Sequence, residues 1–436
     1  MLPLPPRPDI DHYRKRAKDL VRAARSTDDG AVRAWAAGWH RALATSLGGD
    51  VTPFVAGSMT RALTAIADQV RAQQDPARTS SSGFALADAQ LLIARAHGFE
   101  SWARFAGHVQ RLPGRNARFE AAADAVVDGD LPALQALVAA QPDLARTRST
   151  RVHHATLLHY VAANGVEDFR QRSPKNAADV ARFLLESGAD ADALADTYGR
   201  DRLQTTMNLL VSSGHPVASG VQVPLVDVLV DYGAQVNGLD DDGSPLMTAI
   251  AFGYRDAAEA LVRRGARVDT IVTAAALGRA DLVGDYLMDG RTLRPGVPLV
   301  DPPWFRLPKE PVAHIELALS WACRFGRGEV AHRMLDRGVS PRAHDKDHMT
   351  ALHWASASGL LDVVDRLIRM GALLEARNDW GGTVLDSTLY FVRHDPAFGV
   401  DYLPVIGRLL EAGADVTAID SAPTGDGRID DLLRDH

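Results

Sequence analysis

Cysteine is almost absent from this sequence, since Cys323 is the only one among 436 residues. A single thiol cannot form an internal disulfide, and no cysteine pair exists to hold structural zinc or an iron–sulfur centre. We therefore expect a reducing, cytoplasmic environment. Apolar runs are short as well. No stretch of about 18 apolar residues occurs, and the N-terminal MLPLPPRPDIDHYRKR has no apolar core of secretory length, so we expect neither membrane spanning nor export.

A clustered basic excess is missing too. The chain has 48 lysine and arginine residues against 55 aspartate and glutamate residues, which gives a formal net charge of −7. Nucleic-acid binding needs basic clusters against the phosphates, so we expect no nucleic-acid partner. Hydrophobic residues make up 46% of the chain and charged residues 24%, which is typical of a globular protein able to bury large cores.

Signature motifs of the common enzyme classes are also absent. The sequence contains no G-x-S-x-G, G-x-x-x-x-G-K-[ST], G-x-G-x-x-G or H-E-x-x-H segment. His314–Glu316 imitates the H-x-E of zinc deaminases, but the P-C-x-x-C segment that would supply thiolates is missing. Asp190–Asp192 imitates the start of a calcium loop, yet Ala195 stands where Gly is required. We therefore expect no catalytic residue, no cofactor and no metal.

What the sequence does contain is an internal repeat: a short apolar helix ending in Gly, a second helix, then Gly-Ala or a close variant. The clearest copy is TALHWASASGLLDVVDRLIRMGALLEA, residues 350–376, where apolar residues recur at helical spacing. Gly359 and Gly371 are expected to end its two helices, because Gly enters the left-handed C-cap conformation without steric cost. The same interval separates three further pairs: Gly253 and Gly265, Gly278 and Gly290, and Gly326 and Gly338.

The segment TALHWA, Thr350–Ala355, resembles the ankyrin signature T-P-L-H-x-A, with Ala351 in place of the usual Pro. Weaker copies begin at Thr156, Ser244 and Thr383. Second-helix endings of ankyrin type also recur, among them LLESGADADA, LVRRGARVDT and LLEAGADVTA. The chain is therefore similar to ankyrin-repeat proteins over roughly residues 118–420, with about eight repeats on the 33-residue period of that family.

This resemblance implies an all-α fold, an ankyrin-type solenoid of about eight irregular helix pairs joined by projecting hairpin turns. It also implies that Thr156 and Thr350 cap helices and that His159 and His353 are structural, tying helix starts to neighbouring turns. Insertions fall at loops, which in solenoids lie along one edge and often serve binding. The irregular segments are expected at 166–178, 215–223 and 291–311.

Residues 1–112 do not follow the repeat. Four segments are predicted as helices: 9–26, 31–47, 58–74 and 86–112. Parts of this leader resemble the helical leader of ankyrin arrays in some bacterial proteins, which implies a bacterial source. Because a repeat stack exposes apolar surface at each end, we expect the leader to be an N-terminal cap, with binding of an acidic partner by its basic face as the alternative. The predicted organisation is a leader at 1–112, an array at 113–420 and a C-terminal tail at 421–436.

The concave face supplies most of the candidate binding residues. In ankyrin arrays the fifth residue before the first-helix Gly points toward this face, which by resemblance selects Tyr160, Trp321 and Trp354. Arg324 and Phe325 lie beside them at the end of the helix that carries Trp321. Trp, Tyr and Arg dominate binding hot spots, because they bury large areas with few rotatable bonds. We predict that these residues contact a partner; the alternative is that the tryptophans pack over their neighbours.

The tips of the hairpin fingers form a second predicted surface. Most residues there are turn formers, since Asx and Gly chemistry makes tight turns. Trp380 is an exception, because a hairpin gains little from an exposed indole unless something covers it. The sequence thus predicts a non-catalytic protein–protein interaction scaffold that binds an unidentified protein partner through its concave face and finger loops.

The alternative is an enzyme or a small-molecule-binding protein. In this interpretation the segment 291–311, with Trp304 and Phe305, closes as a lid over the groove of repeats five to seven. His314 and Glu316 are then the acid–base candidates. The depth of the groove should distinguish the two interpretations, because a macromolecule needs an open concavity and chemistry needs a closed one.

Overall fold

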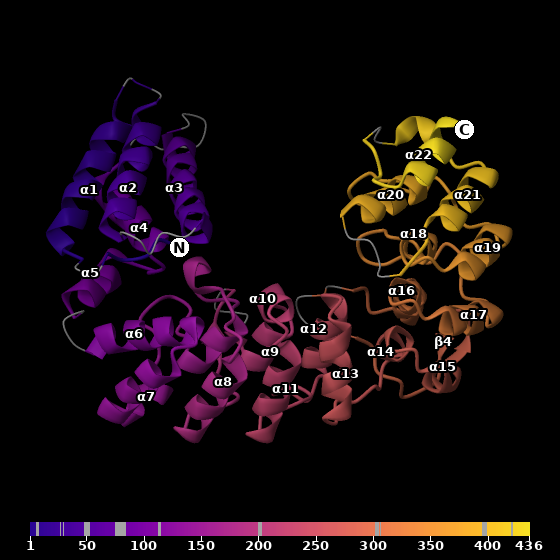
Figure 1. The fold of residues 1–436 in the computed structure, drawn as a ribbon, viewed down its shortest axis with the longest axis horizontal. Coiled ribbons are helices and arrows are strands. Elements are labelled where there is room, and N and C mark those ends of the chain that lie inside the picture. The colour runs from indigo at the N-terminus through magenta and orange to yellow at the C-terminus, as the bar shows by residue number, and fades with distance from the viewer. Residues whose placement is uncertain are drawn as a thin grey trace. The chain divides into compact units, whose positions relative to one another are not determined.

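The computed structural model describes residues 1–5, 8–26, 28, 30–47, 53–74, 84–111, 115–198, 203–300, 305, 307–394, 399–419 and 422–436. It forms two compact units, Met1–Leu239 and Asp240–His436. Within each unit, short helices lie side by side in sequence order (Figure 1). The division between the units falls inside the predicted array. No helix among the described residues combines the length and the apolarity needed to cross a membrane.

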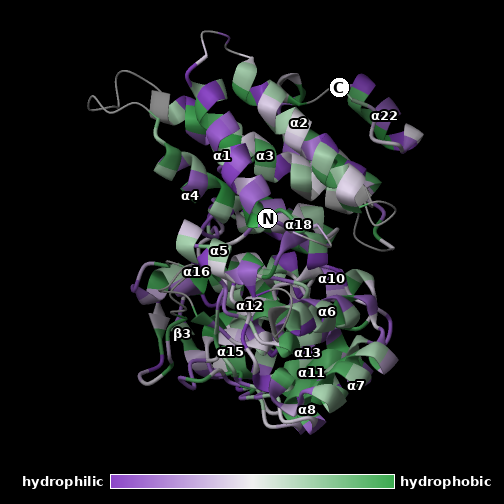
Figure 2. Ribbon diagram, turned by 90° about the vertical axis from the view of Figure 1, so that its left-hand side faces the viewer, coloured by the Kyte–Doolittle hydropathy of each residue, from purple (hydrophilic) through white to green (hydrophobic). Residues whose placement is uncertain are grey.

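The first unit begins with a bundle of leader helices: α1 (Ile10–Ala24), α2 (Ala31–Leu47), α3 (Pro53–Gln74), α4 (Leu86–Ala96) and α5 (Trp102–Gln110). Figure 2 shows hydrophilic and hydrophobic residues side by side along α1, as expected for a helix with one polar and one apolar face. Tyr13 and Leu20 of that helix are buried in the leader core with Trp39. The single helix predicted at 86–112 is wrong, because Gly98 at φ +79° separates α4 from α5.

The leader packs against the helix pairs that follow it. Phe169, which belongs to the predicted insertion 166–178, joins the hydrophobic core of the leader. The backbone N–H of Val152 donates to the carbonyl of Gly98 at 2.8 Å. The insertion therefore forms a docking element between the leader and the first repeats.

The rest of the first unit contains further helix pairs and one short hairpin. Its elements are α6 (Arg115–Asp128), α7 (Leu131–Ala140), η2 (Pro142–Arg146), η3 (Leu157–Ala162), η4 (Asp168–Arg170), α8 (Ala177–Glu186), β1 (Ala195–Asp196), β2 (Leu203–Gln204), α9 (Thr206–Leu210), α10 (Gly214–Ala218) and α11 (Gln222–Asp231). The inner row runs from α6 over η3 to α9, and α8 packs on α11. The segment expected as the first helix of a repeat at residue 156 is the 3₁₀ helix η3, which ends at Ala163 in the left-handed conformation.

The second unit is a more regular stack. Its elements are α12 (Ser244–Ala251), α13 (Arg255–Arg263), α14 (Ile271–Ala276), α15 (Ala280–Tyr286), β3 (Leu287–Asp289), β4 (Thr292–Leu293), α16 (Pro311–Arg324), α17 (Gly328–Asp336), α18 (Ala351–Ala357), α19 (Leu361–Arg369), α20 (Val384–His394), α21 (Leu403–Glu411), η5 (Val416–Ala418) and α22 (Gly427–Arg434). One row packs as α14, α16, α18 and α20, and a second as α15, α17, α19 and α21. The predicted all-α stack of helix pairs is confirmed.

Glycine ends most helices of the second unit, and α15 is one of the exceptions. Gly359 and Gly371 have φ values of +69° and +86°, as the repeat pattern predicted. Gly290 instead lies in the turn between β3 and β4, because α15 runs directly into a strand at Leu287. A side chain at Gly290 would collide with the carbonyl of Gly338. The prediction that Gly290 ends a helix is therefore wrong, and close backbone approach explains the glycine.

The Thr and His residues of the signature act as helix caps. Thr350 Oγ1 accepts the backbone N–H of His353 at 3.2 Å, and the Nδ1 atom of His353 lies 2.7 Å from the same oxygen. His159 bonds Thr156 in the same manner at 2.9 Å, and its Nε2 atom lies 2.9 Å from the carbonyl of Ala193. Both histidines are fully buried, so their predicted structural role is confirmed.

Leu352 and Leu367 test how far the stack depends on its inner packing. Both side chains are fully buried in the second unit. We expect Leu352→Ala or Leu367→Ala to lower the free energy of unfolding by about 2 to 5 kcal/mol, because each leaves a cavity that rigid neighbours cannot fill. Leu361→Ala is the matched control, since Leu361 is 38% exposed on α19 and should cost far less. Urea unfolding followed by circular dichroism measures the difference, and equal losses would contradict the expectation.

Candidate functional site

A cavity of about 770 Å³ opens in the second unit. Its walls come from α12, α16, α18 and α20 and from two finger loops that precede α18 and α20. Aromatic rings dominate the lining: Phe252, Phe305, Trp321, Trp354, Trp380, Tyr390 and Phe391. The charged lining residues are Arg324, Asp345, Lys346, Asp347 and Asp386. A mostly apolar concavity with a few fixed polar groups is the usual form of a binding site.

Asp345 fixes the central tryptophan. The indole Nε1 of Trp354 donates to Asp345 Oδ2 at 2.8 Å, and Asp345 Oδ1 accepts the backbone N–H groups of Asp347 and Met349, each at 3.0 Å. Burial raises the pKa of Asp345, and the hydrogen bonds from Trp354 and the backbone oppose that shift. The hydrogen bond therefore holds the Trp354 ring in one orientation, and the ring centroid lies 5.6 Å from that of Phe391.

The second finger positions Trp380 at the rim. Asn378 Oδ1 accepts the backbone N–H groups of Trp380 and Gly382 at 3.0 Å, which closes an Asx-type turn. The N–H of Asp379 donates to the carbonyl of Asp347 at 3.1 Å, so the two fingers are joined. Trp380 itself is 74% exposed. The structure thus presents a large exposed indole on a tied-down turn, beside the cavity.

The other predicted contact residues differ in their exposure. Trp321 is only 2% exposed and packs edge to face on Phe305, so it forms the wall of the cavity and offers a partner little area. Phe325 is 6% exposed and is not in the lining, so its expected exposure on the concave face is corrected. Tyr160 belongs to the first unit and is fully buried, with its hydroxyl donating to Glu167 at 3.3 Å. Burial removes both Phe325 and Tyr160 from direct contact with a partner.

The described part of the segment 291–311 is docked rather than open. It starts as the β3–β4 hairpin, and Phe305 is buried against Trp321. His314 is also buried, and its Nδ1 atom accepts the backbone N–H of Val300 while Nε2 lies 2.9 Å from the carbonyl of Pro308. His314 therefore anchors this segment. Trp304, the other residue proposed for a lid, lies outside the described residues, and no cluster of metal-ligating side chains occurs within the described part of the chain.

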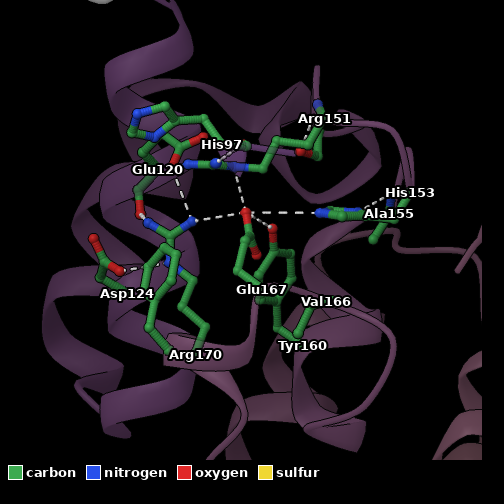
Figure 3. A network of polar contacts seen from close by, with 12 residues as sticks. His97, Glu120, Asp124, Arg151, His153, Ala155, Tyr160, Val166, Glu167 and Arg170 are labelled. Carbon is green, nitrogen blue, oxygen red and sulfur yellow. Dashed lines mark hydrogen bonds and ion pairs between the residues drawn. The ribbon is translucent and has the colours of Figure 1, made fainter. Parts of the chain in front are cut away.

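A second unusual feature lies in the first unit. Arg151 and Arg170 are buried beside Glu120 and Glu167, as Figure 3 shows. Arg151 donates to Glu120 Oε2 at 2.9 Å and also pairs with Glu167, and Arg170 donates to Glu120 Oε2 at 2.8 Å and to Glu167 Oε1 at 3.3 Å. Arg170 also pairs with Asp124 at 2.7 Å. The positive charges of the two arginines are thus neutralised in the interior by the negative charges of the two glutamates.

The members of this network come from three separate segments. Glu120 lies on α6, Arg151 in the loop before η3, and Glu167 and Arg170 at η4. Burial alone would raise the pKa of Glu120, but the two arginines overcome it and lower that pKa to about 2. Arg151 also donates to the carbonyl of His97 in the leader at 2.7 Å. The network therefore ties the leader, the first repeat and the insertion together, and we assign it a structural role.

Sequence reasoning missed this network and part of the cavity. Asp345, Met349 and Tyr390 were not predicted as contact residues, although all three line the cavity. The position of Tyr390 in the sequence could have indicated it. Tyr390 lies three residues after Ser387, which in the last repeat corresponds to Trp321 and Trp354 on the concave face. Because residues three apart on a helix share a face, Tyr390 belongs to the same surface.

Stacked helix pairs with glycine-ended helices, intervening finger loops and a side-chain-lined concavity define a helical solenoid of the repeat type. The family model "Ankyrin repeat" matches residues 347–379, which contain the Thr350 signature and end inside the second finger. Human "Ankyrin repeat and SOCS box protein 16" is 26% identical over 324 residues, 69% of this chain and 66% of that relative. The chain is an ankyrin-repeat protein.

Other similarities are shorter. The potassium channel KOR2 of Oryza sativa subsp. japonica is 39% identical over 75 residues, 16% of this chain and 10% of that relative. Human palmitoyltransferase ZDHHC13 is 31% identical over 99 residues, 23% of this chain and 15% of that protein. The crystal structure of the human ASB11 ankyrin repeat domain aligns with a TM-score of 0.33 at 21% identity, covering 67% of this chain and 98% of that one.

The matches thus cover less than two thirds of each of these relatives. All three are eukaryotic proteins, so the bacterial source and the cytoplasmic location stay predictions. Ankyrin repeats generally serve as protein–protein interaction modules, which agrees with a protein partner for this chain.

Proposed function

We propose that the aromatic cavity of the second unit is a non-catalytic docking site for a segment of another protein. Trp354, Trp380 and Arg324 supply the contacts, and Trp321 supports them from the wall. The observation that carries the proposal is the cavity of about 770 Å³, lined by seven aromatic side chains, one of which is 74% exposed. Such a surface is costly to leave in water and gains free energy when a partner covers it.

Rigidity also supports this proposal. The two fingers are joined by the hydrogen bond from Asp379 to Asp347, and Trp354 is held by Asp345. A preorganised surface loses little conformational entropy when it binds, so more of the contact free energy appears as affinity. Phe305 of the 291–311 segment and His314 of α16 are both buried, which gives the enzymatic alternative no support.

The experiment is a selection of short peptides from a phage-displayed random library against the purified chain, followed by calorimetry. We expect Trp380→Ala and Trp354→Ala each to weaken binding of the selected peptides by about 2 kcal/mol, or about thirtyfold. Trp380→Ala should leave the unfolding midpoint unchanged, because the indole is exposed. Tyr198→Ala is the control, since Tyr198 is a 53% exposed finger residue of the first unit. Peptides that bind both tryptophan variants as tightly as the wild type would place the site elsewhere.

A further inference from the structure

Arg324 is held in the cavity wall by aromatic rings. Its guanidinium carbon lies 5.0 Å from the ring centroid of Trp354, 5.8 Å from that of Trp321 and 5.5 Å from that of Phe325. Cation–π attraction of this kind fixes the position of the group without consuming its N–H donors. One donor is used, because Nη1 bonds the carbonyl of Ala251 at 3.1 Å. The other guanidinium nitrogens make no hydrogen bond within the described residues.

No carboxylate of the described residues forms an ion pair with Arg324. Asp345 directs its two oxygens to Trp354 and to backbone N–H groups, as described above. Asp347 is neutralised by Lys346, whose ammonium lies 2.6 Å from its carboxylate. Burial lowers the pKa of Arg324, and Asp345 and Asp347 only partly oppose that shift. The cavity therefore contains a partly desolvated cation that lacks a counter-ion, an arrangement that costs free energy until an anion arrives.

We propose that the protein segment bound in this cavity places an aspartate or glutamate side chain on Arg324. The inference rests on the proposed function, and it adds the chemistry of the partner. A guanidinium is planar and matches a carboxylate with two parallel hydrogen bonds, whereas the aromatic lining takes the apolar residues on either side. We assign a side chain rather than a chain terminus, because the lining residues extend over four helices, α12, α16, α18 and α20, so a segment lying across them reaches Arg324 with an internal residue.

Asp386 is the lining residue that would favour a basic group, rather than an acidic one, on the bound segment. It lies in the first turn of α20, lines the cavity and forms no ion pair within the described ranges. Its position in the first turn already stabilises its carboxylate, since the positive end of the helix dipole lies there. Arg324 likewise lies at a favourable helix end, in the last turn of α16, yet burial still lowers its pKa, so its charge is not fully compensated. We therefore assign the acidic group of the segment to Arg324 and regard a basic group at Asp386 as secondary.

The test uses the selected peptides. We expect them to share an aspartate or glutamate beside apolar residues. Replacing that residue with asparagine or glutamine in the peptide should weaken binding at least about tenfold, the size of a charge-assisted bond. Arg324→Gln should cause the same loss, and the two changes together should cost no more than either alone. Arg333→Gln on α17 is the matched control, because Arg333 is 54% exposed and is not in the lining.

Each outcome decides a different point. Peptides that need Trp380 but lack an acidic residue, or that bind Arg324→Gln as tightly as the wild type, would overturn this inference and leave the proposed function intact. Enrichment of basic residues alone would overturn it in favour of Asp386. Failure to select any peptide that depends on Trp380 would overturn both proposals. The amide-substituted peptide tests the inference on unaltered protein, so the result does not depend on how Arg324→Gln folds.

Discussion

Arg170→Met should lower the free energy of unfolding of the first unit by about 3 to 5 kcal/mol, because removing one partner of a buried charge network leaves the others uncompensated. Arg170 is 3% exposed and serves Glu120, Asp124 and Glu167 at once. Methionine keeps most of the side-chain volume, so the loss reports charge rather than packing. Urea unfolding monitored by tryptophan fluorescence and circular dichroism measures it.

Arg172→Met is the matched control for this variant. Arg172 pairs with Asp128, but both side chains are about half exposed, and exposed pairs contribute about 0 to 1 kcal/mol. A double-mutant cycle between Arg170→Met and Glu120→Gln should show strong coupling, since the two groups share one hydrogen bond in the interior. If Arg170→Met and Arg172→Met cost the same, the network does not stabilise the unit.

The regular parts of the fold could be predicted because they follow local rules. The unit at residues 350–376 forms α18 and α19 with both glycine caps, since the apolar period and the C-cap chemistry are encoded within a few residues. The predictions were wrong at positions where residues nearby in the sequence do not determine the backbone conformation. Gly98 divides a helix that the period alone favours, and Gly290 serves a contact with residue 338, which is distant in sequence.

Part of the candidate site could be predicted because it follows the repeat pattern. Trp321 and Trp354 share a register in successive repeats, and both line the cavity. Their exposure could not be predicted, because Phe305 covers Trp321 from a loop with no repeat pattern. The buried network was missed because Glu120, Arg151 and Glu167 lie 31 and 16 residues apart on different segments, as their numbers in the chain show. Tertiary packing alone brings them together.

A steep loss of stability on acidification is expected for the first unit. Burial lowers the pKa of His97 to about 3 and the pKa values of His108 and His159 to about 4, because desolvation disfavours the charged ring. These rings stay neutral in the folded state, whereas the unfolded chain binds protons near pH 6.5. The stabilisation is therefore fully present above pH 6.5 and is lost as the pH falls, down to about pH 4 for His108 and His159 and to about pH 3 for His97.

The size of this effect follows from the proton count. Each such histidine costs about 1.4 kcal/mol per pH unit below its unfolded pKa, so three of them should lower the free energy of unfolding by several kcal/mol between pH 6.5 and pH 5. Glu120 contributes to stability in a second, lower pH range. Its pKa is lower in the folded state than in the unfolded chain, so its contribution is present above about pH 4.5 and is lost as the pH falls toward 2. Urea unfolding at a series of pH values separates the two. His97→Gln should reduce the slope between pH 6.5 and about pH 3, whereas an unaltered slope would mean that His97 is protonated in the folded state. The series above pH 7 serves as the internal control, because the three rings are neutral there in both states.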